Sequence, residues 1–342
     1  MSLSQAALTN LARIVAAIGA CLLVSCAPYG TGSQAEQTAS WQTLPVPPLN
    51  WAKARPADLR PPWMRLQASP KGETGYTFVT EMWDTAVNAY EIHNRKGGGP
   101  VCQVGPVRIA QGMTVDASGN LYVVTHFLHK IGVATFGPNC GNPGRRFVSP
   151  RGLPQDPITD GNTLYVTELS DLIEVYGIRS GESPLRKLSD KSVAEGIGLA
   201  VDSHHNLFWS VLGQPWMQGE VVIFASGKMP GRVLVAPKMG HDFPGGVMTD
   251  RSDNLLLVDQ TANAIYIYAP PYKTPPFSVI PLKGTAVYCA LTPRQDRLYC
   301  MDYQYGSVDA YKYPGGAYLY SYTNGIDESE EPIGIAIQPA SS

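Results

Sequence analysis

The sequence of 342 residues contains no apolar run of the about 20 residues that a transmembrane helix needs. Charged residues make up only 16% of it, and the formal net charge of −2 gives no reason to expect nucleic acid as a partner. The G-x-S-x-G turn of hydrolases, the GK[ST] of phosphate-binding loops and CxxC pairs are all missing. The sequence therefore contains no motif that indicates nucleophilic, phosphate or zinc chemistry.

The N-terminus has the pattern of an export signal. Arg13 precedes the apolar run IVAAIGACLLV (14–24), which has the length of a signal-peptide core. The following LVSC resembles a bacterial lipobox, whose cysteine receives the lipid, here Cys26. We therefore predict a lipoprotein signal peptide over 1–25 and a lipid anchor that holds the protein in the bacterial cell envelope, periplasmic or at the surface. The alternative is an ordinary secretory signal that is cut nearby, with Cys26 incidental.

A proline-rich segment follows the signal. Residues 26–70 contain eight prolines and little periodicity, which excludes a long helix or a central strand. We interpret them as a tether between the membrane and a folded body over 71–342. The tether also carries Trp41, Trp51 and Trp63, which either pack on the body or form an aromatic patch for a partner.

Four cysteines remain outside the export segment, and an even number in an exported chain favours disulfides. Cys289 and Cys300 flank the turn TPRQDR, and they oppose each other if Thr292 faces Arg297. Cys102 and Cys140 pair by elimination. The alternative is that all four are small buried apolar residues.

One hairpin is repeated along the chain, as in GMTVDASGNLYVVT, GLAVDSHHNLFWSV and GVMTDRSDNLLLVD. Each copy has a short strand, a polar turn, a second strand and a third strand that often ends in Tyr. The turns, 42 to 48 residues apart, are marked by Asp116, Asp160, Asp202, Asp250, Thr292 and Gln338. Four antiparallel strands in about 44 residues are typical of a β-propeller blade.

The two ends of the repeat region complete each other. The segment from Tyr76 begins with a second strand, and GIAIQP (334–339) is a first strand with no second strand after it. We predict an all-β, six-bladed β-propeller of four-stranded antiparallel blades, closed by the C-terminal strand joining the N-terminal blade. A sandwich and a seven-bladed ring with one degenerate blade are the alternatives. Over 76–339 the repeats resemble NHL repeats, a resemblance that implies this fold and leaves the function open.

In a propeller the second strands end at the same mouth at which the innermost strands begin. The second strands end at Glu81, Thr125, Glu168, Val211, Asp259 and Asp302. The innermost strands begin near Gln111, Asp156, Glu195, His241 with Asp242, and Tyr288, and the segment DESEE (327–331) reaches the same face. We therefore predict an acidic mouth that attracts cations, basic peptides or polyamines.

A second interpretation exists for the strand-end carboxylates. Asp259 and Asp302, and less well Glu81 and Glu168, can accept backbone N–H bonds and cap the following turn. Glu195 and Asp242 have no such role in the repeat, so they are the better candidates for function. The alternative is that they simply lie in solvated loops.

The fold is also similar to the gluconolactonase-like propellers, a resemblance that implies a divalent metal such as calcium in the central channel. Glu195 matches the Glu of their E-G-P motif, but Ile197 replaces the Pro. Gly245 stands at the Asp of P-D-G, and Gln111 at an Asn. Glu195 is therefore the one metal ligand of the family's motifs that this sequence keeps. A calcium site needs several oxygen ligands.

A propeller lyase that binds zinc through histidines is a further alternative, and only His126 and His241 could reach the mouth for it. We therefore predict a monomeric scaffold that binds a protein or small-molecule ligand, cationic in character, at its mouth. No cofactor is assigned, and the candidate is a divalent cation such as calcium, which Glu195, Asp242 and the ring carboxylates could bind in a different site. A metal-dependent lactonase or hydrolase that uses the same channel is the second hypothesis.

Overall fold

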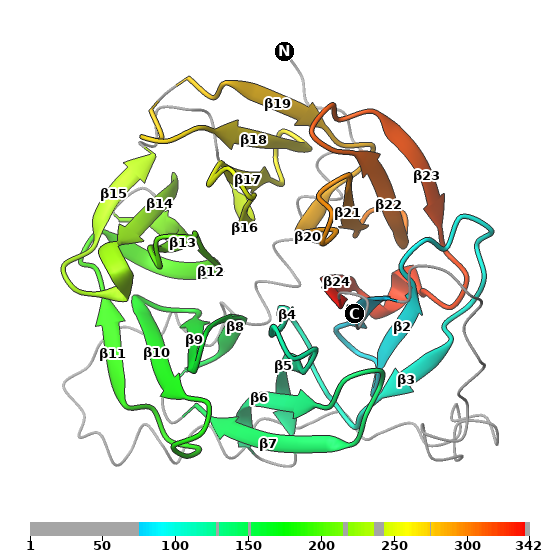
Figure 1. Ribbon diagram of the computed structural model, residues 1–342, viewed down its shortest axis with the longest axis horizontal. Coiled ribbons are helices and arrows are strands. Elements are labelled where there is room, and N and C mark those ends of the chain that lie inside the picture. Colours follow the sequence, from blue (N-terminus) through cyan, green and yellow to red (C-terminus); the bar gives the residue numbers. More distant parts are fainter. Residues whose placement is uncertain are drawn as a thin grey trace. The chain divides into compact units, whose positions relative to one another are not determined.

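The computed structural model describes residues 75–127, 130–149, 152–214, 218–235, 243–273 and 275–338. The predicted signal peptide, Cys26 and the tether with its three tryptophans lie outside these residues. Six four-stranded antiparallel sheets form a ring (Figure 1), which confirms the predicted six-bladed propeller. The helices among the described residues are all too short or too polar to cross a membrane.

From the innermost to the outermost strand, blade 1 has β24 (Pro332–Gln338), β1 (Tyr76–Glu81), β2 (Val87–Glu91) and β3 (Cys102–Val104), and the other blades follow in the same order. Blade 2 has β4 (Met113–Val115), β5 (Leu121–Phe127), β6 (Lys130–Phe136) and β7 (Pro143–Val148). Blade 3 has β8 (Pro154–Asp160), β9 (Thr163–Glu168), β10 (Leu172–Gly177) and β11 (Arg186–Ser189).

Blade 4 has β12 (Val193–Val201), β13 (Leu207–Gly213), β14 (Gln218–Phe224) and β15 (Arg232–Val235). Blade 5 has β16 (Pro244–Thr249), β17 (Leu255–Asp259), β18 (Ala264–Tyr268) and β19 (Ser278–Pro281). Blade 6 has β20 (Ala286–Leu291), β21 (Arg297–Asp302), β22 (Ser307–Lys312) and β23 (Tyr318–Tyr322). Two short 3-10 helices, η5 (Ala225–Gly227) and η7 (Glu328–Glu330), lie in connections.

The repeated aspartate explains why the first hairpin of several blades forms where it does. In blade 2, Asp116 Oδ1 accepts the backbone N–H groups of Ser118 and Asn120, each at 2.9 Å. The Asn120 side chain returns a bond to Asp116 Oδ2 at 2.9 Å. Asp202 and Asp250 hold their turns in the same way. The D-x-x-x-N spacing therefore fixes the register of these hairpins, because the side chain satisfies the turn's own backbone donors.

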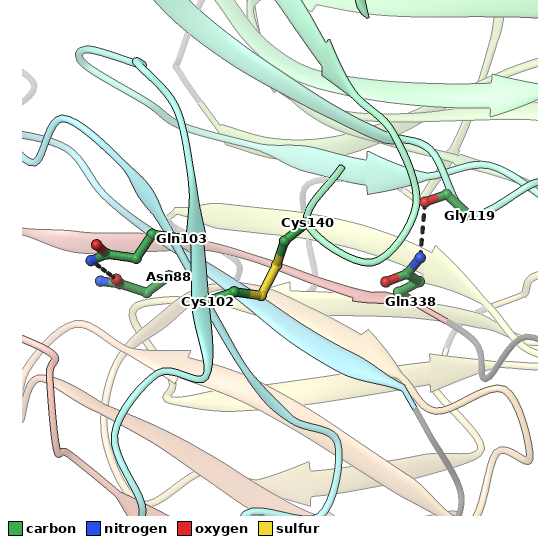
Figure 2. The surroundings of a disulfide bond; sticks show 6 residues. All are labelled: Asn88, Cys102, Gln103, Gly119, Cys140 and Gln338. Atoms are coloured by element: carbon green, nitrogen blue, oxygen red, sulfur yellow. Dashed lines mark hydrogen bonds between the residues drawn. A yellow bond between two sulfur atoms is a disulfide. The ribbon is translucent and has the colours of Figure 1, made fainter. Parts of the chain in front are cut away.

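The ring is closed by the last strand of the chain. β24 pairs antiparallel with β1, with Tyr76 opposite Gln338 and Thr80 opposite Gly334. The side chain of Gln338 then reaches blade 2, where its Nε2 donates to the Gly119 carbonyl at 3.1 Å (Figure 2). The C-terminal strand thus completes blade 1 and also bonds to the next blade, as the split repeat predicts.

Neighbouring blades pack through apolar side chains that alternate along their strands. Between blades 3 and 4, Trp209 is fully buried against Tyr165 and Phe224, and its indole N–H donates to Thr167 at 2.6 Å. Hydroxyls on second strands also join blades, as when Ser210 donates to the Gly245 carbonyl at 2.7 Å. The core is therefore six apolar layers between sheets rather than one central cluster.

Both predicted disulfides are present. Cys289 and Cys300 face each other across β20 and β21, with their Cα atoms 4.1 Å apart. Cys102 in β3 bonds to Cys140, which lies in the β6–β7 turn of blade 2, with their Cα atoms 6.5 Å apart (Figure 2). The first bond strengthens one hairpin, whereas the second joins two blades beside the closing strand. Two disulfides are compatible with an extracytoplasmic location.

Replacing Cys289 and Cys300 together with Ala should lower the free energy of unfolding by about 2–3 kcal/mol, because the bond closes a short loop in the unfolded chain. The hairpin keeps its register through the other backbone bonds of β20 and β21. Urea unfolding in parallel with the wild type checks the value. Addition of reductant should then destabilise this variant less than the wild type, and an equal loss in both would contradict a role for this bond.

Candidate functional site

The connections of each blade define two faces. The mouth is the face where second strands end and innermost strands begin, and the opposite face carries the turns between first and second strands. The strand-end carboxylates lie at the mouth end of their strands, but their side chains are buried. Glu81 is 4% exposed, Glu168 1%, Asp259 0% and Asp302 2%.

Hydrogen bonds explain the burial of the two aspartates. Asp259 Oδ1 accepts the N–H groups of Thr261 and Ala262, both at 2.9 Å. Asp302 Oδ1 accepts those of Gln304 and Tyr305 at 2.9 and 3.2 Å. These aspartates therefore cap the turns that follow their strands, which is the second interpretation of the sequence. Burial, with the nearby Asp309 adding to it, raises the pKa of Asp302 to about 7.

The two glutamates have different environments. Glu168 Oε1 accepts the Ser149 hydroxyl at 2.9 Å, and burial together with the neighbouring Glu174 raises its pKa to about 8. Glu174 in turn accepts a bond from Tyr176 at 2.5 Å and lies 3.5 Å from the Lys187 ammonium. Two carboxyl groups and one lysine are thus buried together, an arrangement in which one carboxyl group holds a proton near neutral pH.

The centre of the ring is crossed by a tyrosine. Tyr288, in β20 of blade 6, donates to the Ile197 carbonyl in blade 4 at 3.0 Å and lies 3.4 Å from the Gln155 carbonyl in blade 3. Gly246 makes room for it, since a Cβ there would lie 2.6 Å from the Tyr288 ring. Burial raises the pKa of this tyrosine well above its usual value.

Asp156, close to this crossing, is buried and joins blades 3 and 4, accepting the Leu199 N–H at 2.9 Å. Burial raises its pKa well above its usual value. Tyr288 thus links blade 6 to blades 3 and 4 across the ring, with Asp156 buried nearby. The repeat pattern places both residues at the mouth, but it does not indicate this contact across the ring.

The remaining candidates are not gathered at one point. Glu195 is half-buried in β12, where burial raises its pKa, and Gln111 is buried before β4. His126 lies in β5, while His241 and Asp242 fall outside the described residues. Among the described His, Cys, Asp and Glu side chains, one group of three is close enough to share a metal ion, and it lies on the opposite face.

An acidic rim with an exposed tryptophan stands at the mouth between blades 6 and 1. Trp83 is 47% exposed, and its backbone N–H donates to the Glu330 carbonyl at 3.2 Å. The Asp327 N–H donates to Glu81 Oε1 at 2.8 Å, which ties the DESEE segment to the end of β1. We define the acidic rim as Glu81, Asp84, Asp327, Glu328, Glu330 and Glu331, with Trp83.

The acidic neighbours of Glu81 and its burial both favour the neutral form of its carboxyl group. Burial raises the pKa of Glu81 to about 8, and Asp84, Asp327 and Glu330 raise it further. The Glu331 carboxyl also has a raised pKa through burial, although the Trp83 side chain bonds to it. Sequence reasoning found the DESEE segment and Glu81 but missed Trp83. An aromatic residue two positions after a strand-end carboxylate, in EMWD, is the signal that could have found it.

Comparison with known proteins gives the fold and no family. No family model and no curated protein matches the sequence. Among solved structures, a crystal structure of a nidogen/laminin complex contains a chain with a TM-score of 0.65 and 16% identity, covering 78% of this chain and 100% of that one. A streptogramin B lyase structure has a TM-score of 0.51 and 12% identity, covering 81% of this chain and 79% of the lyase. The chain is thus similar to these proteins in its β-propeller fold.

Proposed function

We propose that the protein is a lipid-anchored propeller of the cell envelope that binds a ligand carrying ammonium or guanidinium groups at the acidic rim of its mouth. The observation that carries this proposal is the juxtaposition of an exposed Trp83 with carboxylates from two blades. The charges that act on Glu81 all come from acidic neighbours. Such a surface attracts cations at long range and offers an aromatic face for close contact.

The fold itself does not choose between binding and catalysis. It occurs in a nidogen/laminin complex, where the name denotes a protein assembly, and in a lyase. The Tyr288 side chain that crosses the ring favours the rim over the channel as the contact surface. Export and lipid attachment rest on the sequence of the first 26 residues.

A basic probe should bind the rim and lose affinity when the tryptophan is removed. We expect an oligolysine peptide to bind the whole protein at low salt, and Trp83→Ala to weaken it by about tenfold, the size of a partly desolvated cation–π contact. Glu328→Gln should weaken it less, because its carboxylate is exposed and screened. Fluorescence anisotropy of the labelled peptide measures both changes.

The matched control is Glu182→Gln. Glu182 is exposed in the β10–β11 connection of blade 3, away from the rim between blades 6 and 1, and its substitution changes the net charge as Glu328→Gln does. It should leave the affinity unchanged. Equal weakening by both glutamine variants would mean that net charge alone attracts the peptide, and the rim proposal would then fail. Stoichiometric calcium lost in Glu195→Gln would instead support a metal-dependent hydrolase in the channel.

A further inference from the structure

Two turns meet on the face opposite the mouth and bring three metal-ligating side chains together. Asp202 and His204 lie in the β12–β13 turn of blade 4, and Asp253 lies in the β16–β17 turn of blade 5. One ligand atom from each lies within 4.8 Å of the other two. Asp202 is 7% exposed, whereas the His204 side chain is 74% exposed and can move without disturbing the core.

The spacing suits a small divalent ion. His204 Nδ1 lies 3.2 Å from Asp253 Oδ2. Ligand atoms about 2.0–2.1 Å from a tetrahedral zinc ion are about 3.3 Å from each other. Ser203 supports the arrangement from behind, donating its backbone N–H to Asp253 Oδ1 at 2.9 Å and its hydroxyl to Oδ2 at 2.7 Å. Metal-binding carboxylates commonly have such an outer hydrogen bond.

Asp202 differs from its counterparts in the equivalent turns. Asp116 Oδ2 accepts a second bond from the Tyr122 hydroxyl at 3.1 Å, and Asp250 Oδ2 accepts one from Tyr313 at 2.7 Å. Asp202 Oδ2 accepts only the Asn206 side chain, at 2.8 Å, among the hydrogen bonds of the described residues.

The sequence explains the missing bond. Phe208 stands where Tyr122 stands in blade 2, so the hydroxyl is absent. Tyr272, which packs edge-on against Phe208, donates to the Asp253 backbone carbonyl at 3.0 Å instead. Asp202 Oδ2 therefore keeps an acceptor position that a tyrosine hydroxyl fills in the equivalent turns of blades 2 and 5.

We propose that Asp202, His204 and Asp253 bind one Zn²⁺ ion that joins blades 4 and 5 on the face opposite the mouth. An imidazole nitrogen with two carboxylate oxygens is a ligand set that zinc accepts, with the fourth position open to water or to a ligand from outside. The site is independent of the acidic rim. It lies on the opposite face, and it binds a metal ion rather than a ligand with ammonium or guanidinium groups.

Isothermal titration of the full chain with ZnCl₂ tests the proposal. The protein should carry no histidine tag, and its free thiols should be alkylated so that Cys21 and Cys26 do not compete. We expect one zinc per chain that excess Ca²⁺ does not displace, because calcium prefers all-oxygen sites. His204→Ala and Asp253→Asn should each weaken binding by more than about tenfold, and Ser203→Ala by about tenfold, as for an outer-shell partner.

His205→Ala is the matched control. His205 is the next residue, is similarly exposed at 69%, and lies 2.8 Å from Asp160 of blade 3. This variant should bind zinc as the wild type does. Failure of the wild type to bind zinc at millimolar concentration would overturn the proposal. So would zinc binding that His204→Ala leaves intact, or that His205→Ala weakens as much as His204→Ala. Circular dichroism should first show that each variant is folded.

Discussion

Replacing Gly334 with Val should lower the free energy of unfolding by about 5 kcal/mol. Gly334 lies in the closing strand β24, where a Cβ would stand 2.1 Å from the Gln111 carbonyl oxygen and 2.3 Å from Thr80 Oγ1. The Gly334 N–H donates to this same hydroxyl, which itself donates to Gln111. The variant therefore adds overpacking of up to about 3 kcal/mol to the loss of two buried hydrogen bonds of about 1 kcal/mol each.

Chemical denaturation followed by intrinsic fluorescence measures this loss. Gly315→Val is the matched control, because a Cβ at this exposed position in the β22–β23 turn meets no atom within 4 Å. It should change the stability by less than about 1 kcal/mol, as surface substitutions do. If the two valine variants were equally stable, the close contacts of Gly334 with Thr80 and Gln111 would not contribute to the stability of the closed ring.

The protein should be more stable near pH 5 than near pH 8.5, by about 3 kcal/mol or more. Glu81 and Glu168 have folded-state pKa values of about 8 against 4.5, and Asp302 about 7 against 3.8. The folded state therefore binds more protons than the unfolded state across this interval. Because the folded pKa values are raised, their contribution is complete below about pH 4 and is lost as the pH rises through 7 to 8.

Glu168→Gln isolates the contribution of one of these groups, a glutamate with a folded-state pKa of about 8. A glutamine keeps the shape, stays neutral, and can donate to the neighbouring Glu174. At pH 8.5 the variant should be about 2–3 kcal/mol more stable than the wild type, and near pH 5 the two should differ little. Melting temperatures at both pH values, with Glu182→Gln as an exposed control, check the prediction. An unchanged pH profile in Glu168→Gln would show that this carboxyl group is ionised when folded at neutral pH.

The fold could be predicted from the sequence because its signals are local and repeated. Each D-x-x-x-N turn satisfies its own backbone, and the apolar strands on either side of it set the register. The Cys289–Cys300 disulfide followed from counting residues outward from the turn TPRQDR, and the split repeat indicated which strand closes the ring.

The candidate site could be predicted only in part. The repeat places Glu81, Glu168, Asp259 and Asp302 at one end of their strands, but whether such a side chain is buried depends on the loops of neighbouring blades. Tyr288 crosses the ring to residues 91 and 133 positions away, a contact that no local pattern contains. The backbone of Trp83 bonds to Glu330 of the DESEE segment, a contact that also arises only in the closed ring.

The closing strand also sets the timing of folding during synthesis. Thr80 and Gly334, which are neighbours in blade 1, are 254 positions apart in the chain. At about 5–20 residues per second, roughly 13–50 s pass between the synthesis of the two. During that interval β1 has an unpaired inner edge, which is the kind of edge that recruits other strands. In an exported chain Cys102 and Cys140 leave the cytoplasm before β24, so their bond can form in the oxidising compartment and hold blades 1 and 2 together before β24 arrives.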